Sequence, residues 1–163
     1  MKYDLIAIVA AAAVAGGLCV AQTPLSKKGP RNMKFLLMMH MKTDPESMSK
    51  GIMTWAPADI EAHIRFMKTL NRQLKESGEL VSADGLAWPD QARLVGAGKN
   101  GEPVTDGVFP ESKEFLIGFW TIEVDSPERA YQIAARASAA PGRGGAPLNM
   151  PIEVRQIMAG PPE

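Results

Sequence analysis

The chain has 163 residues, which is enough for one domain of ordinary size and too few for two domains with separate cores. Its 18 basic and 18 acidic side chains balance, so the composition indicates no basic surface for nucleic acid or for an anionic membrane. A single cysteine excludes a disulfide framework and a zinc–cysteine site, and two histidines are too few for a histidine-rich metal site. No cofactor-binding motif is present, so we expect no cofactor.

Residues 5–21 form an uncharged apolar run that follows Lys2 and ends in small residues at Ala21. This is the layout of a secretory signal peptide, and at 17 residues the run is short for a membrane span. We therefore expect cleavage after Ala21 and an exported protein, periplasmic or secreted, with no stable membrane association afterwards. Cleavage also removes Cys19, which suits an oxidising compartment. The alternatives are an uncleaved anchor, a lipoprotein at Cys19, or a cytoplasmic protein whose translation starts at Met33.

Three further segments follow the predicted leader. Residues 22–32 are polar and contain two prolines and a glycine, which is typical of a linker. Residues 33–158 then form one domain, and residues 159–163 form a proline-rich tail.

The domain is expected to open with a strand at residues 34–41, which is apolar on both faces and therefore covered on both sides. A long loop over residues 42–56 precedes a helix that runs from about Ala58 to Ser77. Pro57 suits the first turn of this helix and Gly78 suits its end.

The apolar residues of this helix recur at helical spacing and form one stripe. His63 and Asn71 fall inside the stripe, which places two polar side chains on the face that packs inward. The stripe consists of Ile60, Ile64, Met67, Leu70 and Leu74.

Three strands are expected between the first helix and the second, at residues 79–83, 91–97 and 114–124. One of them is open to the alternative of a minor hairpin. Residues 98–111 are rich in turn-forming residues and are expected to form a long connection. The strand at 114–124 is apolar on both faces near its centre.

A second helix begins at Ser126-Pro127-Glu128, where the serine suits the cap, the proline the first turn and the acid the positive end of the helix dipole. It runs to about Ser138 and carries a face of small residues that permits close packing on a sheet. A loop rich in glycine and proline follows, and a half-exposed strand at 152–158 completes the domain.

The expected order is therefore β-α-β-β-β-α-β, an α+β ferredoxin-like sandwich with a mainly antiparallel sheet. Two helices cover only one face of such a sheet, and yet two strands are apolar on both faces. A homodimer in which the open faces meet resolves this mismatch.

Two residues are candidates for acid–base chemistry. His63 lies on the inward stripe of the first helix, and histidine is a natural general acid or base near neutral pH. The alternative is a core histidine bonded to a backbone carbonyl. Asp84 lies at a strand end, where a carboxylate can orient a histidine, and its alternative role is that of a turn aspartate bonded to nearby amides.

A third polar cluster precedes the strand at 114–124 and includes Asp106, Glu111 and Lys113. These residues, with Arg155 on the last strand, are candidate ligand-binding residues at the mouth of a cavity. The alternative is a solvated loop with weak surface ion pairs. His40 has no nearby second ligand and is expected in the core or in the dimer interface.

The sequence resembles the YCII-related family over residues 33–158. The resemblance rests on GELVSADGLAWPDQARLV, on VTDGVFPESKEFLIGFWTIEVDSPERAYQIAARA and on IEVRQI, in that order. Within the family it is similar to the branch named for the DGPF motif, D-G-P-F-A-E-T-K-E. Residues 106–114 match that motif at six of nine positions, with Val108, Pro110 and Ser112 as the differences.

The resemblance implies a dimeric α/β barrel of ferredoxin-like subunits, an unsettled activity, and a histidine–aspartate pair at a cleft. The nearest candidates for that pair are His63 and Asp84, although the histidine of the short members falls one helical turn later, at Met67.

Three functions follow from these observations. The first is a small acid–base enzyme in which His63 and Asp84 act on a small polar or carbonyl-bearing molecule. The second is a non-catalytic dimer that binds a small ligand. The third is an exported structural or stress-related dimer without a ligand site.

Overall fold

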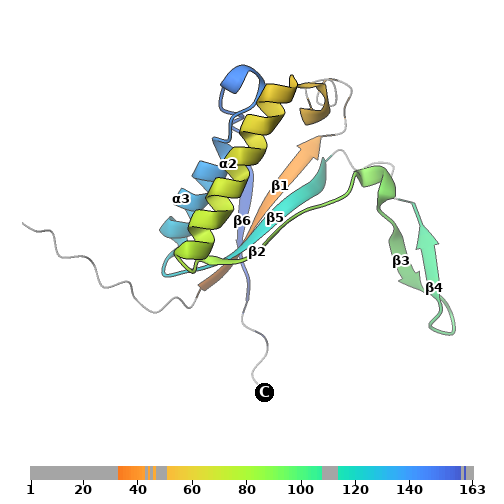
Figure 1. The fold of residues 1–163 in the computed structure, drawn as a ribbon. Helices are drawn as coiled ribbons and strands as arrows, with labels where there is room; N and C mark the ends of the chain where they lie inside the picture. The colour runs from red at the N-terminus through yellow and green to blue at the C-terminus, as the bar shows by residue number, and fades with distance from the viewer. Residues whose placement is uncertain are drawn as a thin grey trace, which may run out of the picture.

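A computed structural model of the chain describes residues 33–42, 44, 46, 51–107, 114–158 and 160. Its body is one antiparallel sheet with two helices packed on the same face (Figure 1). The strands of this sheet are β1 (Met33–Lys42), β2 (Leu80–Gly85), β5 (Glu114–Val124) and β6 (Ile152–Gln156), and the helices are α2 (Pro57–Glu76) and α3 (Pro127–Ser138). Short 3₁₀ turns occur at η1 (Ile52–Thr54), η2 (Pro89–Gln91) and η3 (Arg143–Gly145).

The sheet has the strand order β2-β5-β1-β6, and every neighbouring pair in it is antiparallel. Helix α2 connects β1 to β2 and helix α3 connects β5 to β6, so each helix returns the chain across the sheet as in a split βαβ unit. This confirms the predicted ferredoxin-like α+β fold with both helices on one face. The sheet face turned away from α2 and α3 is called the open face below.

The hydrophobic core lies between the sheet and the two helices. Leu37, Trp120 and Ile122 contribute to it from the sheet and are at most 5% exposed. The predicted small-residue face of α3 is confirmed, because its members are all buried there: Ala130, Ile133, Ala134 and Ala137. Close packing of this helix on the sheet depends on those short side chains.

The predicted apolar stripe of α2 is only partly buried. Leu70 and Leu74 are in the core, whereas Ile64 is 43% exposed. The last turns of α2 pack on the sheet, while the face of its earlier turns borders a cavity that is described below. Periodicity identifies the inward face of a helix, but it does not say how far along the helix that face is covered.

A second, two-stranded sheet accounts for the middle of the chain. Strand β3 (Leu94–Ala97) pairs with β4 (Pro103–Asp106), and this hairpin projects away from the body (Figure 1). The strand predicted at residues 91–97 is therefore part of a minor hairpin, which was one of the two alternatives for this segment. The expectation that residues 98–111 form only a connection is wrong, since β4 lies within it. Strand β4 has only four residues, and its Val104 is 54% exposed. Such a short strand shows too little alternation of apolar and polar residues to be identified from the sequence.

Both helices have the predicted ends. Ser126 caps α3, because its Oγ accepts a hydrogen bond from the backbone N–H of Arg129 at 3.3 Å. At the end of α2, Gly78 has a φ of +68°, a conformation that favours glycine. The N–H of Glu79 then donates to the carbonyl of Leu74 at 2.8 Å, which closes the helix.

A buried ion pair joins the two helices and was not predicted. The Glu79 side chain follows α2 and is 1% exposed, and Arg129 on α3 donates to its two carboxylate oxygens at 2.8 and 2.9 Å. Ser77 Oγ donates to the same carboxylate at 2.6 Å. The hydrogen bond to Glu79 raises the pKa of Arg129 above its ordinary value.

Within the described ranges, no helix combines the length and the apolar character needed to span a membrane. The predicted signal peptide and linker lie outside the described residues, as does the predicted tail except for Gly160.

Candidate functional site

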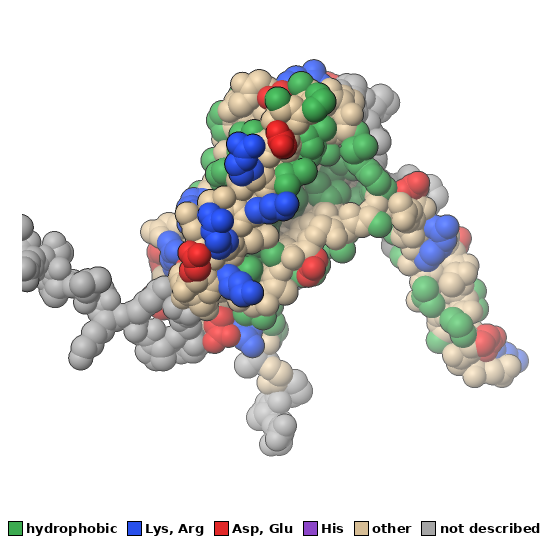
Figure 2. All heavy atoms as spheres, in the orientation of Figure 1, with side chains coloured by type: hydrophobic (Ala, Val, Ile, Leu, Met, Phe, Trp, Pro, Cys, Tyr) green, Lys and Arg blue, Asp and Glu red, His purple; other side chains and the backbone are tan. Residues whose placement is uncertain are grey.

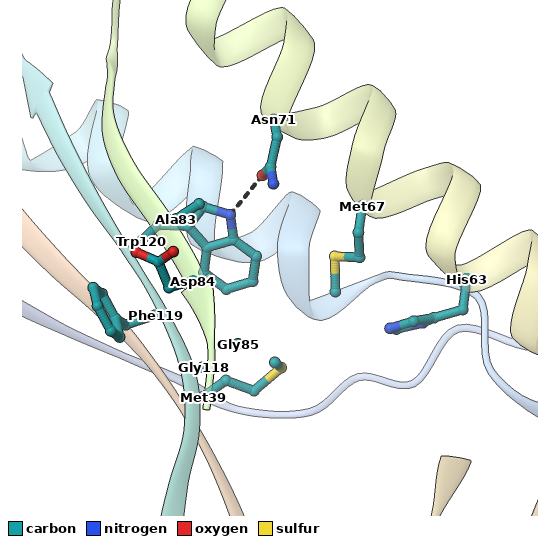
Figure 3. Close-up of a pocket in the computed structure, with 10 residues that line it drawn as sticks. All are labelled: Met39, His63, Met67, Asn71, Ala83, Asp84, Gly85, Gly118, Phe119 and Trp120. Carbon is teal, nitrogen blue, oxygen red and sulfur yellow. Dashed lines mark hydrogen bonds between the residues drawn. The ribbon is translucent and has the colours of Figure 1, made fainter. Parts of the chain in front are cut away.

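A cavity of about 230 Å³ lies between α2 and strands β1, β2 and β5. Figure 2 shows the surface hollowed beneath α2, with hydrophobic side chains around the hollow. Figure 3 shows its lining residues, which come from α2 (His63, Met67, Asn71), β1 (Met39), β2 (Ala83, Asp84, Gly85) and β5 (Gly118, Phe119, Trp120). This volume is large enough for a small organic molecule, since an apolar cavity of about 150 Å³ holds benzene.

One face of α2 forms the roof of the cavity. His63, Met67 and Asn71 follow one another at intervals of four residues, which puts them on the same side of a helix in successive turns. Met67, where the family resemblance implies a histidine, lines the cavity, and His63 lines it one turn earlier. The inward placement predicted for His63 and Asn71 is thus the placement that the structure has.

The imidazole of His63 is held by a backbone carbonyl. Its Nδ1 lies 3.0 Å from the carbonyl oxygen of Pro141. A carbonyl oxygen only accepts hydrogen bonds, so Nδ1 carries the proton and, in the neutral ring, Nε2 has a free lone pair. The edge of the buried Trp55 packs against the imidazole with ring centroids 5.6 Å apart and planes at 84°, which fixes the ring further.

The carbonyl of Pro141 is itself positioned by contacts to the start of α2. The backbone N–H of Gly144 donates to Asp59 Oδ2 at 2.9 Å, and Arg143 Nη2 donates to Thr54 Oγ1 at 2.8 Å. Sequence reasoning foresaw a backbone carbonyl as one possible partner for His63. It could not identify Pro141, because the two residues are 78 positions apart.

Asn71 is also held by one specific partner. Trp120 Nε1 donates to Asn71 Oδ1 at 2.8 Å, across 49 positions of sequence. An indole N–H only donates, which determines that the amide oxygen faces Trp120 and that Nδ2 lies on the other side. Within the described part of the chain, no buried side-chain nitrogen lacks a partner and no hydrogen bond from Nδ2 occurs, so Nδ2 reaches the open space of the site.

Gly118 keeps the floor of the cavity open. A Cβ at this position would lie 3.2 Å from the carbonyl oxygen of Asp84 and 3.3 Å from the terminal methyl group of Met39. Any larger residue would therefore push on Met39 and on the β2 backbone and fill part of the space. Glycine in a strand interior often marks such a close approach.

The structure does not bring the carboxylate of Asp84 to His63. Ala83 pairs with Trp120 and packs on the core, so the next residue, Asp84, points to the opposite, open face beside Phe119. In Figure 3 the Asp84 carboxylate is turned away from the imidazole, although Asp84 is among the residues that line the cavity. Among the described residues, no hydrogen bond joins His63 to a carboxylate. A direct histidine–aspartate pair, as expected from the sequence, is therefore not formed in this subunit.

Of the four predicted ligand-binding residues, the two that the structure describes, Asp106 and Arg155, do not line the cavity. Asp106 ends β4 in the projecting hairpin, where its Oδ1 accepts the N–H of Gly107 at 2.7 Å. Arg155 lies on β6 at the other edge of the sheet, with its side chain 71% exposed and its Nε 3.8 Å from Glu153. Glu111 and Lys113 lie outside the described residues.

His40 is on the open face rather than in the cavity. Its Nε2 lies 3.9 Å from Glu153 Oε2, and Glu153 pairs across the sheet with Met38. His40 is therefore not a core residue, and its place in a dimer interface stays a prediction.

The cavity is weakly polar. None of its lining residues is a lysine or an arginine, and its inward polar groups are His63 and Asn71. In the part of the chain that the structure describes, no three His, Cys, Asp or Glu side chains are placed to hold a metal ion. The site offers one imidazole and one amide against an apolar wall.

The comparison with protein families matches the part of the chain that forms the cavity. The model of the YCII-related domain matches residues 33–145, which include every residue that lines the cavity. No curated protein matches the chain.

Proposed function

The chain belongs to the YCII-related domain family, and from that premise we propose that it is a small acid–base enzyme that uses His63. Its substrate is a small polar or carbonyl-bearing molecule bound between α2 and the sheet. The observation that carries the proposal is the bond from His63 Nδ1 to the Pro141 carbonyl. That bond leaves the basic Nε2 of the ring for the cavity.

The proton step follows from this tautomer. Nε2 accepts a proton from the bound molecule, and the ring becomes an imidazolium that still donates through Nδ1 to Pro141. The proton returns from Nε2 to another atom of the molecule or to water, which restores the neutral ring. Proton transfer by a positioned side chain typically contributes about 10²–10⁴-fold to a rate. We assign no proton step to the Asp84 carboxylate, which lies on the other face of β2.

Hydrogen–deuterium exchange tests this proposal without knowledge of the natural substrate. Small ketones, lactones and amides are incubated with the protein in D₂O, and deuterium uptake next to the carbonyl is followed by NMR. We expect uptake into at least one compound, and we expect His63→Gln to slow it about 10²-fold or more. His40→Gln is the matched control, because it removes the other histidine of the chain on the open face. Uptake that is equal in His63→Gln and the wild-type protein would refute catalysis by this histidine.

A non-catalytic binding site is the second candidate. It is favoured by the partner of His63, which is a carbonyl rather than a carboxylate, and by the cavity itself. In that case the screen shows no deuterium uptake, while small molecules still bind in the cavity. Deuterium uptake that depends on His63 would count against this version.

We further propose that two copies associate through their open faces. Leu36, Met38 and Phe119 alternate with core residues on β1 and β5 and therefore point to the face that α2 and α3 leave uncovered. Leu36→Lys, at a half-buried position of this face, is expected to shift the protein from dimer to monomer in light scattering after size exclusion. Met53→Lys is the control, because Met53 in η1 is 74% exposed. A monomeric wild-type protein would refute the dimer.

Export and membership of the DGPF branch are proposals from sequence. Export is supported by residues 5–21, and the branch by the six matching positions in residues 106–114. N-terminal sequencing of the protein from its own cell is expected to start at Gln22. A chain that starts at Met1 contradicts cleavage, and one that starts at Met33 contradicts export.

A further inference from the structure

We infer that the cavity selects a ligand without negative charge that donates a hydrogen bond at one end and accepts one at the other. The inference rests on the proposed function in one respect, namely that Nε2 of His63 faces the bound molecule. It goes beyond that function because it gives the chemical class of the ligand.

Whether each end of the cavity donates or accepts a hydrogen bond is determined by a bond to a neighbouring residue. At one end, the Pro141 carbonyl occupies Nδ1 of His63 and makes Nε2 of the neutral ring an acceptor. At the other end, the Trp120 indole occupies Oδ1 of Asn71 and leaves Nδ2 as a donor. As long as the His63 ring is neutral, neither side chain can reverse its role without losing a bond to its neighbour. The ligand must therefore offer a donor to His63 and an acceptor to Asn71.

The two ends are separated along the helix. His63 and Asn71 are two turns apart on α2, which corresponds to about 12 Å between their Cα atoms. Met67 lies between them, and Met39 and the Trp120 ring face it from the sheet (Figure 3). Thioether and aromatic groups suit a flat apolar or aromatic middle section. The ligand is thus elongated, with polar atoms at its ends.

The cavity also limits the charge and the size of the ligand. The lining residues include no lysine or arginine, so an anion would lose its hydration there without gaining a cationic partner. The cavity of about 230 Å³ exceeds the roughly 150 Å³ that holds benzene, which sets the ligand at about ten non-hydrogen atoms. An aromatic ring with a hydroxyl group at one end and a carboxamide at the other meets every requirement.

Three probes test the inference: 4-hydroxybenzamide, its isosteric anion 4-hydroxybenzoate, and benzamide, which lacks the hydroxyl donor. Each is titrated into the ¹⁵N-labelled protein while the indole N–H signal of Trp120 is followed, and Trp120→Phe assigns that signal among the three tryptophans. We expect 4-hydroxybenzamide to shift the signal and to bind at least about tenfold more tightly than 4-hydroxybenzoate. Benzamide is expected to bind about 2–10-fold more weakly than 4-hydroxybenzamide, as for the loss of one hydrogen bond.

Asn71→Asp removes the Nδ2 donor and keeps an acceptor for the hydrogen bond from Trp120. The aspartate still accepts from Trp120, but it replaces the Nδ2 donor by a negative charge, so the affinity for 4-hydroxybenzamide should fall at least about tenfold. Asn100→Asp makes the same chemical change in the exposed β3–β4 turn and should leave the affinity unchanged. The persistence of the Trp55 and Trp88 indole signals at their wild-type positions shows that the variant is folded.

Three results would overturn the inference: equal affinity for the amide and the carboxylate, unchanged affinity in Asn71→Asp, or no shift of the Trp120 signal with any probe. The proposed catalysis fails separately. If the amide binds as expected and no deuterium uptake depends on His63, then the site binds ligands without proton transfer. If uptake depends on His63 and carboxylates bind as well as amides, then the ligand class is wrong and the catalysis stands.

Discussion

Replacing Arg129 by methionine tests the buried ion pair between the two helices. The Glu79 side chain is 1% exposed and accepts three hydrogen bonds, two from Arg129 at 2.8 and 2.9 Å and one from Ser77 at 2.6 Å. Arg129→Met removes two of these bonds and the compensating charge, and it leaves a carboxylate in the core. Breaking a buried pair in this way costs about 3–5 kcal/mol of the free energy of unfolding, much of the 5–15 kcal/mol of a typical domain.

Urea denaturation followed by tryptophan fluorescence measures this loss as a lower transition midpoint. The matched variant is the double replacement Glu79→Leu with Arg129→Met, in which no charge stays buried. We expect it to be more stable than Arg129→Met alone, because removing both partners of a buried pair is often nearly neutral. A loss below about 1 kcal/mol in Arg129→Met would refute the reasoning, as would a double variant less stable than the single one.

The direction in which pH changes the contribution of the Arg129 charge to stability follows from the pKa shift of Arg129. The hydrogen bond to Glu79 raises the pKa of Arg129 above its ordinary value, and a raised pKa of a cation adds stability that is fully present below the unfolded-state pKa. The charge of Arg129 therefore contributes equally to stability at pH 7 and pH 9. A difference between wild-type protein and Arg129→Met that shrinks markedly over this interval would contradict this assignment.

Three further predictions concern local features. Gly118→Ala should lower the free energy of unfolding by about 1–3 kcal/mol in urea denaturation and weaken 4-hydroxybenzamide binding, because its Cβ would press on Met39 at the cavity floor. Unchanged binding would contradict the position of the site. Ser126→Ala should destabilise the protein by about 1 kcal/mol, whereas Ala56→Ser should stabilise it by a smaller amount, since α3 has a side-chain cap and α2 has none; opposite signs would refute the capping argument. Gly78→Ala should cost about 1–2 kcal/mol of unfolding free energy for its φ of +68°, and a neutral effect would mean that the end of α2 relaxes.

Much of the fold follows from local signals in the sequence. The proline and serine at the start of α3 and the glycine after α2 mark helix ends through short-range backbone hydrogen bonds, which any sequence with those residues tends to form. Two-sided apolar strands and two helical stripes then leave few architectures, and the ferredoxin-like sandwich is one of them. The inward placement of His63 and Asn71 follows in the same way from helical periodicity.

The chemistry of the site depends on contacts between distant parts of the chain. The tautomer of His63 is set by Pro141 and the orientation of Asn71 by Trp120, and no local pattern encodes either pairing. The strand register determines which face of the sheet the Asp84 side chain lies on, because a shift of a single residue moves a side chain from one face to the other. The sequence by itself determined which elements form and which helix face turns inward. Only the tertiary structure decided which polar atoms meet in the cavity, since those meetings depend on packing between elements far apart in the chain.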